Sequence, residues 1–347
     1  MSNVTSAIAQ VIRGKMGWRW IAGAIGVLII ALAAVTLFKT FREMELGRVI
    51  AAAKAQSPHS LLISGIFVAA GYVTLTFYDV FALRAIGWKA VPYRIAAFAS
   101  FTSYTIGHNI GATVFTSGVI RYRLYSAWGL DVIDIAKIAL ITGLTYWLGN
   151  MFVLGCGIVY APEAASAIDH LPVPINRLVG FCGLAAIAGY VLWLLPRPRL
   201  VGRVNWQVVL PDPRSTLIQI WIGALDLIFV ALAMYAVLPA QPAIDFLDLI
   251  VIFVTAMLIG VVSYAPGSLG VMEAAMFLGL PQFHKEELLA SLLTFRLLYF
   301  VLPLLLAVIL FGLREFRIVI AEAVTRRSVP RLITARKSAA MDAGRSS

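Results

Sequence analysis

Long hydrophobic runs, separated by short polar or charged segments, extend over most of the chain. Because about 20 apolar residues cross the hydrocarbon core of a bilayer as a helix, such runs predict transmembrane helices. The predicted spans are Trp20 to Phe38, Leu61 to Ile86, Val132 to Tyr160, Asn176 to Leu195, Ser215 to Leu238, Phe246 to Ala265 and Leu288 to Leu313. The pattern predicts an all-α polytopic membrane protein with about 7–8 transmembrane helices, two of its elements being broken or re-entrant.

The hydrophobic pattern also divides the chain into parts. We predict a cytoplasmic N-terminus (residues 1–18), a transmembrane domain (residues 19–313) and a basic cytoplasmic tail (residues 314–347) that is disordered. The segment from Lys39 to Lys54 mixes charges with apolar residues near helical spacing. It suits either a helix that lies in the membrane interface or a solvated connector.

The hydrophobic segment Ser103 to Tyr125 differs from the predicted spans because glycines and polar side chains interrupt it. The interrupting residues include Gly107, His108, Asn109, Gly111, Thr113, Ser117 and Gly118. A lipid-facing helix would carry leucine or valine there. Broken backbone is tolerated at membrane depth only inside protein or beside a wet cavity. We therefore predict a broken element that faces the interior of the bundle.

A second interruption, Pro266 to Gly270, precedes the short apolar piece Leu269 to Leu280. A break frees backbone N–H groups, and the short helix that follows presents its positive end. Gly267, Ser268 and Gly270 are therefore candidates for holding a phosphate or carboxylate. The alternative is a kink that only lets helices pack, because glycine and proline are common in membrane helices.

The charged loops test this topology, because lysine and arginine concentrate on the cytoplasmic side of membrane proteins. A re-entrant hairpin from Tyr93 to Gly118 keeps Arg121 and Arg123 inside and the acidic loop near Glu163 outside. The Leu269 to Leu280 piece has to turn back in the same way. Two broken elements that enter from opposite faces are typical of an inverted repeat with a site near the membrane midplane.

Composition agrees with a membrane protein and excludes several other classes. Hydrophobic residues make up 61% of the chain, charged residues 13%, and the mean hydropathy is +0.90. The net charge of +11 is expected to face anionic lipid rather than nucleic acid. Cys156 and Cys182 lie in apolar runs and the 4 histidines are isolated, so we expect no disulfide framework, metal site or other cofactor.

Ionisable residues at membrane depth are candidates for function, since each is costly unless it is paired or wet. Asp226 lies in the middle of its span, Arg296 lies inside the last span, and Glu273 follows the second interruption. Asp79 lies near the inner end of its span. A pair between Arg296 and Glu273 or Asp226 would suit either a structural role or the handling of a lipid headgroup.

The polar end of the broken segment supplies the other candidates. Arg121, Tyr122 and Arg123 suit contact with a lipid phosphate, because a guanidinium group offers several donors. Anchoring at the membrane surface is the alternative, since arginine and tyrosine are ordinary interfacial residues. His108 and Asn109 are either packing residues or, because they lie in a broken helix, functional ones.

Four blocks of sequence also carry a resemblance. The first is SYTIGHNIGATVFTSGVIRYRLYSAWGL preceded by YDVFALRAIG (Tyr78 to Gly87). The others are LDLIFVALAMYAVLPA (from Leu225), YAPGSLGVMEAAMF (from Tyr264) and FRLLYFVLP (from Phe295). In this order they resemble the lysylphosphatidylglycerol synthase transmembrane region, the flippase half of the multiple peptide resistance factor. The resemblance covers roughly residues 65–313.

The resemblance implies a homodimeric flippase that moves aminoacylated phosphatidylglycerol between leaflets of the bacterial inner membrane and confers resistance to antimicrobial peptides. Two-part members of that family continue into a cytosolic aminoacyltransferase domain, and this chain stops at Ser347. We therefore expect a translocator with phospholipid partners and both termini cytoplasmic, not an enzyme. The alternative is a membrane subunit that supports a separately encoded lipid-modifying synthase.

Overall fold

The computed structural model describes Lys54, residues 56–110, 113–195, 199–203 and 206–263, Ser268, residues 270–318 and Ile320. Several predictions lie outside these residues: the N-terminus, the span from Trp20 to Phe38, the connector that follows it, Gly267, and all but the first residues of the tail. The chain divides into two compact units, one of Ala31–Ala307 and one of Met1–Ile30 with Val308–Ser347. The elements that position the site belong to the first unit.

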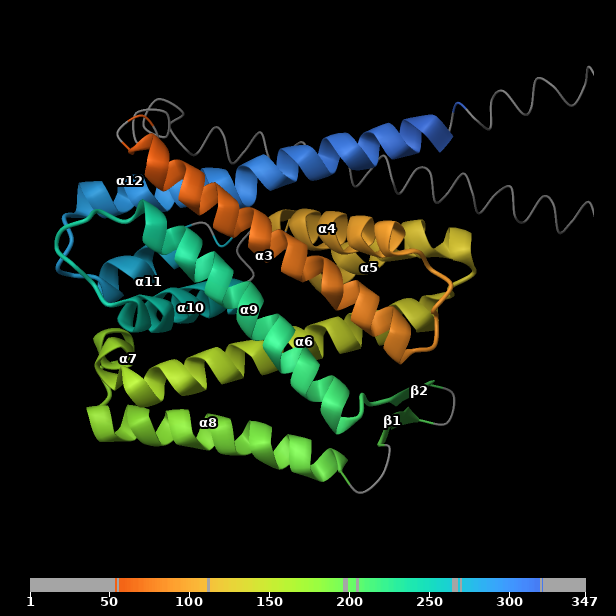
Figure 1. Cartoon of the computed structure of the whole chain (residues 1–347), viewed down its shortest axis with the longest axis horizontal. Helices are drawn as coiled ribbons and strands as arrows, with labels where there is room; N and C mark the ends of the chain where they lie inside the picture. The colour runs from red at the N-terminus through yellow and green to blue at the C-terminus, as the bar shows by residue number, and fades with distance from the viewer. Residues whose placement is uncertain are drawn as a thin grey trace, which may run out of the picture. The chain divides into compact units, whose positions relative to one another are not determined.

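The described part of the first unit is helical apart from one β-hairpin (Figure 1). In chain order the elements are α3 (Pro58–Ala85), α4 (Tyr93–Ile110), α5 (Thr113–Tyr125), a 3₁₀ turn (Ser126–Trp128), α6 (Val132–Tyr160), α7 (Pro162–Asp169), α8 (Val173–Leu194), β1 (Leu200–Arg203), β2 (Trp206–Val209), α9 (Pro213–Val237), α10 (Phe246–Val262), α11 (Val271–Gly279), α12 (Lys285–Arg296) and a π-helical turn (Leu297–Val301).

Among the described residues, 5 helices are long and apolar enough to cross a membrane: α3, α6, α8, α9 and the helix Lys285–Ile318, which begins as α12. The helix α10 is apolar but shorter. The prediction of an all-α polytopic membrane protein is therefore confirmed. These helices coincide with predicted spans because lipid-facing and core-facing positions are both apolar, which gives long hydrophobic runs.

Capping residues explain why several helices begin before their hydrophobic runs. The hydroxyl of Ser57 accepts a hydrogen bond from the N–H of Ser60 at 3.0 Å, and Pro58 occupies the first position of α3. Proline suits that position because its missing N–H would have no partner within the helix. Asp131 and Asp134 form a reciprocal capping box at the start of α6, which begins and ends as predicted.

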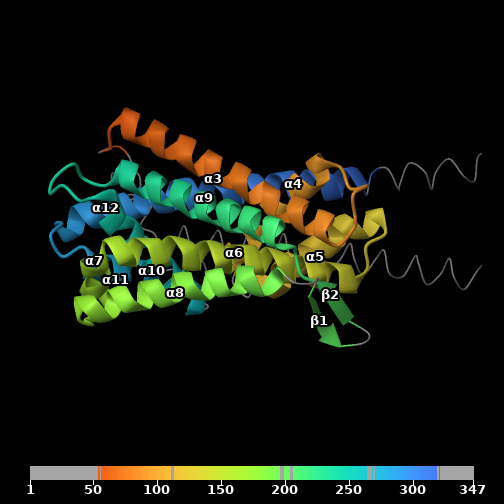
Figure 2. The same ribbon diagram turned by 60° about the horizontal axis from the view of Figure 1, so that its bottom comes forward.

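Two loops contain structure that was not predicted. The acidic loop forms α7, which starts at Pro162 and ends at Asp169; the next residue, His170, has a left-handed conformation (φ 58°). The basic loop contains the antiparallel pair β1 and β2, with Leu200 opposite Val209. Both elements are too short to produce a hydrophobic run, since α7 has 8 residues and each strand has 4. Figure 2 shows the β-hairpin beyond the ends of α8 and α9.

The broken segment is a helical hairpin made of α4 and α5, as predicted. The hydroxyl of Ser117 donates to the carbonyl of Ser103 at 2.8 Å, and the hydroxyl of Thr113 donates to the carbonyl of Gly107 at 3.3 Å. The separation in sequence shrinks toward the turn, so the helices are antiparallel. A Cβ on Gly107 would lie 2.4 Å from the Ser117 Oγ, so the close approach of the helices requires this glycine.

The helices α10 and α11 form a second hairpin. A Cβ on Gly260 would lie 2.6 Å from the Ser268 side chain, and a Cβ on Gly279 would lie 2.4 Å from the Ile252 side chain. The pair nearer the turn, Gly260 with Ser268, is also the closer one in sequence, so the chain runs back along α10 after the turn. The apolar piece after the interruption therefore turns back, as predicted. The end of α10 at Val262 precedes the predicted end, and Tyr264 and Ala265 lie outside the described residues.

The two hairpins enter the bundle from opposite ends. The helices α3 and α9 are antiparallel, because Ser64 donates to the carbonyl of Ala233 at 2.8 Å and Tyr78 donates to Asp226 at 3.2 Å. The α4–α5 hairpin joins the end of α3 to the start of α6, whereas the α10–α11 hairpin follows the end of α9. This arrangement is the one expected of an inverted repeat.

The helix α6 packs between α8 and α9 (Figures 1 and 2). Its contact with α9 is close because a Cβ on Gly149 would lie 2.4 Å from the backbone carbon of Gly223. Beside it, α9, α10 and α12 supply a buried apolar core. In that core Phe253 meets Phe295 edge-on, with ring centroids 5.3 Å apart. Small residues at crossings and aromatic residues in the core therefore hold the hairpins in place.

Candidate functional site

A cavity of about 190 Å³ lies beside the tip of the first hairpin. We call it the central cavity. It is lined by Leu75 and Tyr78 of α3, Ser100, Tyr104 and His108 of α4, Thr113, Val114, Ser117 and Arg121 of α5, Ala139, Thr142, Gly143, Tyr146 and Trp147 of α6, and Val261 of α10. Thr113 opens the return helix of the first hairpin and Val261 is in the last turn before the second interruption. The cavity therefore contacts both broken elements.

His108 is held in the central cavity by aromatic stacking. Its ring lies 5.4 Å from the Tyr104 ring and 5.8 Å from the Phe300 ring, measured between centroids. Its Nε2 atom is buried and has no hydrogen-bond partner among the described residues. A buried polar atom without a protein partner has to be satisfied by water or a ligand. His108 therefore lines the cavity and carries a covered nitrogen that has no partner among the described residues.

Asn109, the neighbour of His108, has a structural role. Its side chain is buried, and its Nδ2 donates to the carbonyl of Thr105 at 2.8 Å within α4. This bond satisfies a backbone carbonyl near the tip of the hairpin. Asn109 does not line the central cavity.

Arg121 lies in a buried network with Asp79 and Tyr125. The carboxylate of Asp79 accepts from Arg121 Nε at 3.1 and 3.0 Å and from Nη2 at 2.8 Å, and the hydroxyl of Tyr125 donates to it at 2.7 Å. Arg121 is 6% exposed, and Asp79 and Tyr125 are 0% exposed. Such a bidentate pair ties α5 to α3. Arg121 Nη1 makes no hydrogen bond to the described residues, and Arg121 also lines the central cavity.

The neighbours of Arg121 are placed differently. Tyr122 and Arg123 are half-buried on α5 and are not among the residues that line the central cavity. Of the three residues that were predicted to contact lipid phosphate, the structure therefore brings Arg121 alone to this cavity.

The second hairpin has its own buried ion pair. Arg296 is 2% exposed, and its Nε donates to Glu273 Oε1 at 2.9 Å, with Nη2 contacting the same oxygen. The guanidinium carbon also lies 5.3 Å from the centre of the Phe300 ring. Of the two predicted partners of Arg296, Glu273 is confirmed. This pair ties α11 to α12, as the pair of Asp79 and Arg121 ties α3 to α5.

The loop between α10 and α11 has an unusual backbone. Ser268 is 3% exposed with φ 54°, and Gly270 has φ 76° at the start of α11. Positive φ favours glycine, so Gly270 suits its position. The side chain of Ser268 packs against Gly260. The described contacts thus assign Ser268 and Gly270 to the turn of the second hairpin.

Asp226 is buried in the middle of α9, 2% exposed, behind the tyrosines of the central cavity. Tyr78 donates to its Oδ2 at 3.2 Å, while Oδ1 has no hydrogen-bond partner among the described residues. The further hydroxyls within electrostatic range are those of Tyr72, Tyr104, Tyr146 and Tyr299. Tyr78, Tyr104 and Tyr146 also line the cavity, so they connect Asp226 with it.

These tyrosines were missed by the sequence analysis. Tyrosine is common where a helix meets the membrane surface, so a tyrosine in a predicted span is readily interpreted as an interfacial residue. Their positions in the sequence could have identified two of them, because Tyr72 and Tyr146 lie near the middle of their helices rather than at the ends. A buried tyrosine hydroxyl needs a polar partner, so tyrosines in the middle of a span indicate a polar interior.

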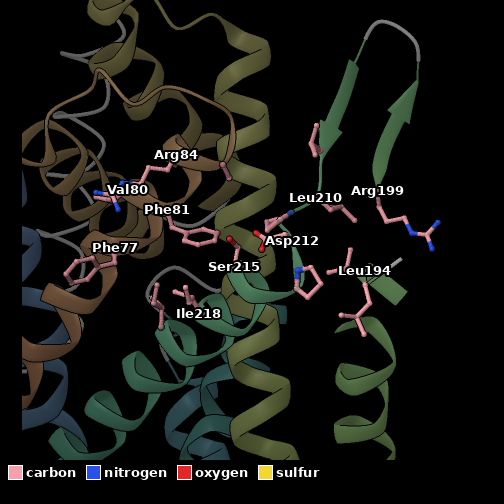
Figure 3. Close-up of a pocket in the computed structure, with 16 residues that line it drawn as sticks. Phe77, Val80, Phe81, Arg84, Leu194, Arg199, Leu210, Asp212, Ser215 and Ile218 are labelled. Atoms are coloured by element: carbon pink, nitrogen blue, oxygen red, sulfur yellow. The ribbon is translucent and has the colours of Figure 1, made fainter. Parts of the chain in front are cut away.

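A larger cleft of about 760 Å³ lies where α3 ends and α9 begins. Figure 3 shows the oxygen atoms of Asp212 and Ser215 close together in the cleft, beside the ring of Phe81. Arg84 and Arg199 also line it, and the guanidinium of Arg199 lies 4.7 Å above the ring of Trp193. None of the residues predicted from the sequence lines this cleft, and it lies at the opposite end of α9 from the second hairpin.

The fold and the central cavity define the class of the protein: a polytopic α-helical membrane protein with two helical hairpins and an internal cavity that both hairpins help to line. The chain is 32% identical over 236 residues to the uncharacterized protein slr0712 of Synechocystis, covering 67% of this chain and 72% of that protein. It therefore belongs to the same family as slr0712. It is also 28% identical over 255 residues to the inner membrane protein YbhN of Escherichia coli, covering 72% of this chain and 78% of YbhN. No family model matches the chain.

The similarity to YbhN and the apolar helices agree on location. A chain with this many apolar helices and an inner-membrane homologue is a multi-pass protein of the inner membrane. Its role is therefore that of an integral membrane protein.

Proposed function

We propose that the protein is a flippase-like translocator that moves a phospholipid between the leaflets of the membrane. The observation that carries this proposal is the central cavity, a mainly apolar space with several polar side chains, lined by the first hairpin and by Val261 of the second. Broken elements of this kind hold substrate near the membrane midplane in transporters. The headgroup would enter the cavity while the acyl chains remain in the bilayer.

Two polar groups in the cavity suit a headgroup phosphate. Arg121 keeps its charge through its pair with Asp79, and Nη1 is left to donate to a ligand. His108 presents a buried nitrogen that has no partner among the described residues. Charge-assisted bonds from arginine to phosphate oxygens are among the stronger hydrogen bonds in proteins. The proposal therefore gives contact with the headgroup to Arg121 and His108.

The substrate that we favour is aminoacylated phosphatidylglycerol. Support for it comes from the four sequence blocks that resemble the lysylphosphatidylglycerol synthase transmembrane region. On this proposal the partners of the chain are membrane lipids, and no residue of the cavity is assigned a catalytic role.

The test is reconstitution of the purified protein in liposomes, followed by measurement of leaflet exchange of labelled phosphatidylglycerol and of its lysyl and alanyl derivatives. We expect exchange above that of protein-free liposomes. The variant His108→Phe keeps the ring stacking and removes the nitrogen, so exchange should fall at least severalfold while the protein stays folded. The matched control His59→Phe changes a histidine outside the cavity and should exchange lipid normally.

Absence of exchange for every lipid tested, from folded protein, would contradict the proposal. Equal exchange by the wild type and His108→Phe would contradict the site while leaving the function in place. Exchange that requires an added lipid-modifying synthase would instead favour a supporting membrane subunit.

A further inference from the structure

Asp226 is a carboxylic acid at membrane depth with little to stabilise a charge. It lies near the middle of α9, and one of its oxygens accepts a single hydrogen bond, from Tyr78. The other oxygen has no partner among the described residues. An ionised carboxylate in such a place is very costly unless a positive charge accompanies it, whereas the neutral acid is far cheaper.

No positive side chain of the described residues accompanies Asp226. Among the described residues of the first unit, the two buried arginines are paired elsewhere, Arg121 with Asp79 and Arg296 with Glu273. The titratable groups that face Asp226 are all tyrosines: Tyr72 and Tyr78 from α3, Tyr104 from α4, Tyr146 from α6 and Tyr299 from the π-helical turn. A tyrosine hydroxyl can donate a hydrogen bond but supplies no counter-charge at neutral pH.

The described residues around the unpartnered oxygen do not form a cluster of metal ligands. Asp226 Oδ1 faces α3 at Gly71, where an added Cβ would lie in ordinary contact with this oxygen, at 3.7 Å. The described residues contain no group of three or more histidine, cysteine, aspartate or glutamate side chains that could hold a metal ion. A proton, unlike a metal ion, needs no cluster of ligands to neutralise the carboxylate.

Asp226 is also connected to the central cavity. Tyr78 donates to Asp226 and lines the cavity, and Tyr104 and Tyr146 line it as well. Through Tyr78, the carboxyl group is one hydrogen bond away from a residue that lines the cavity. The acid is therefore buried but not isolated.

We propose that Asp226 is a proton-exchange site that couples lipid movement to the proton gradient. This inference rests on the proposed function. In one state the O–H bond of the neutral acid is intact and the bundle is closed around it. In the other state that bond breaks, the proton passes to a water molecule in the cavity, and the carboxylate draws water or a cationic headgroup toward itself. The two states differ in charge, so a gradient of protons biases their populations.

The first experiment detects the proton directly and needs no transport. Infrared difference spectra of the purified protein should contain the carbonyl stretching band of a protonated carboxyl group at neutral pH. The band should disappear in Asp226→Asn and persist in Asp245→Asn, which changes an exposed carboxylate at the start of α10. In Tyr78→Phe the band should shift, because that variant removes the one hydrogen bond to Asp226.

The second experiment measures coupling in liposomes. Lipid movement by the wild type should change severalfold when a pH gradient is imposed and should return to its basal rate when a protonophore is added. Asp226→Asn should move lipid at one rate with and without the gradient, whereas Asp245→Asn should respond as the wild type does.

The outcomes separate the two proposals. Lipid movement without a band that depends on Asp226, or with a gradient response that survives in Asp226→Asn, would overturn the proton site and leave the translocator in place. The band without any lipid movement would establish a protonated Asp226 and remove the proposed function. If Asp226→Asn fails to fold, the absence of a shift in Tyr78→Phe would be sufficient to reject the assignment.

Discussion

The buried ion pair of Arg121 and Asp79 joins α5 to α3, and its arginine also lines the central cavity. Two ionised groups inside a membrane bundle are tolerated because each satisfies the other through bidentate bonds. From the sequence, anchoring and lipid contact were the alternatives for Arg121. The geometry adds a third role, a clamp between α3 and α5.

Removing one partner of this pair should destabilise the protein strongly. Asp79→Asn leaves the guanidinium buried without its counter-charge, which we expect to cost about 3–5 kcal/mol of folding free energy. The double variant Asp79→Leu with Arg121→Met removes both charges and should recover most of that loss. Thermal unfolding in detergent measures both, and Arg94→Gln, which changes an exposed arginine of α4, is the control. A double variant no more stable than Asp79→Asn would show that the ion pair itself is required.

Candidate residues could be found from the sequence where a charged side chain lies within an apolar run. Asp226, Arg296 and Glu273 stand out as charged groups in apolar runs, and the structure buries two of them deeply. Their partners could not all be found, because a pair such as Asp79 with Arg121 joins residues 42 positions apart in sequence. The hydrophobic pattern of one helix does not show which residues of other helices will contact it.

At the scale of elements, close contacts between helices depend on individual glycines. The hairpin of α4 and α5 needs Gly107, because an added Cβ would lie 2.4 Å from the Ser117 Oγ and 3.3 Å from the carbonyl of Thr113. We expect Gly107→Val to cost about 1–3 kcal/mol, the usual range for overpacking. Gly118→Ala, in the same hairpin but with open space around it, should be neutral or stabilising by up to about 1 kcal/mol. Chemical denaturation in mild detergent distinguishes these outcomes, and equal stability of the two variants would contradict the close packing.

The crossing of α6 and α9 should be less tolerant. A Cβ on Gly149 would meet backbone atoms of Gly223 at 2.4 Å, and backbone cannot move aside as a side chain can. Gly149→Ala should therefore lower the unfolding temperature more than Gly118→Ala does, even though alanine is the better helix former. Gly189→Ala in α8, where nothing lies within 4 Å, provides a control in a second helix. A normal unfolding temperature for Gly149→Ala would mean that the helices are further apart than described.

At the scale of the whole membrane domain, topology was the most predictable property. Charge in the loops was enough to require that both broken elements turn back, and the hairpins α4–α5 and α10–α11 do so. The elements that were missed are the short ones, α7 and the β-hairpin, because their local preferences are overshadowed by the hydrophobic runs on either side. The size and contents of the central cavity were beyond prediction, since they depend on how five different helices pack.

The opposite entry of the two hairpins predicts which loops share a side of the membrane. In a variant without Cys156 and Cys182, single cysteines at Lys89 and Ala127, at the two ends of the first hairpin, should react with an impermeant maleimide from one side. Cysteines at Ala243 and Gln282, at the ends of the second hairpin, should react from the other side, and all four positions are exposed. Arg84, Arg94 and Arg214 lie at the end of the bundle that includes Lys89, so this side should be cytoplasmic. Labelling of intact spheroplasts and of inverted vesicles tests both statements. Reaction of Lys89→Cys and Ala127→Cys from opposite sides would mean that the first hairpin crosses the membrane, and would remove the geometry on which the central cavity depends.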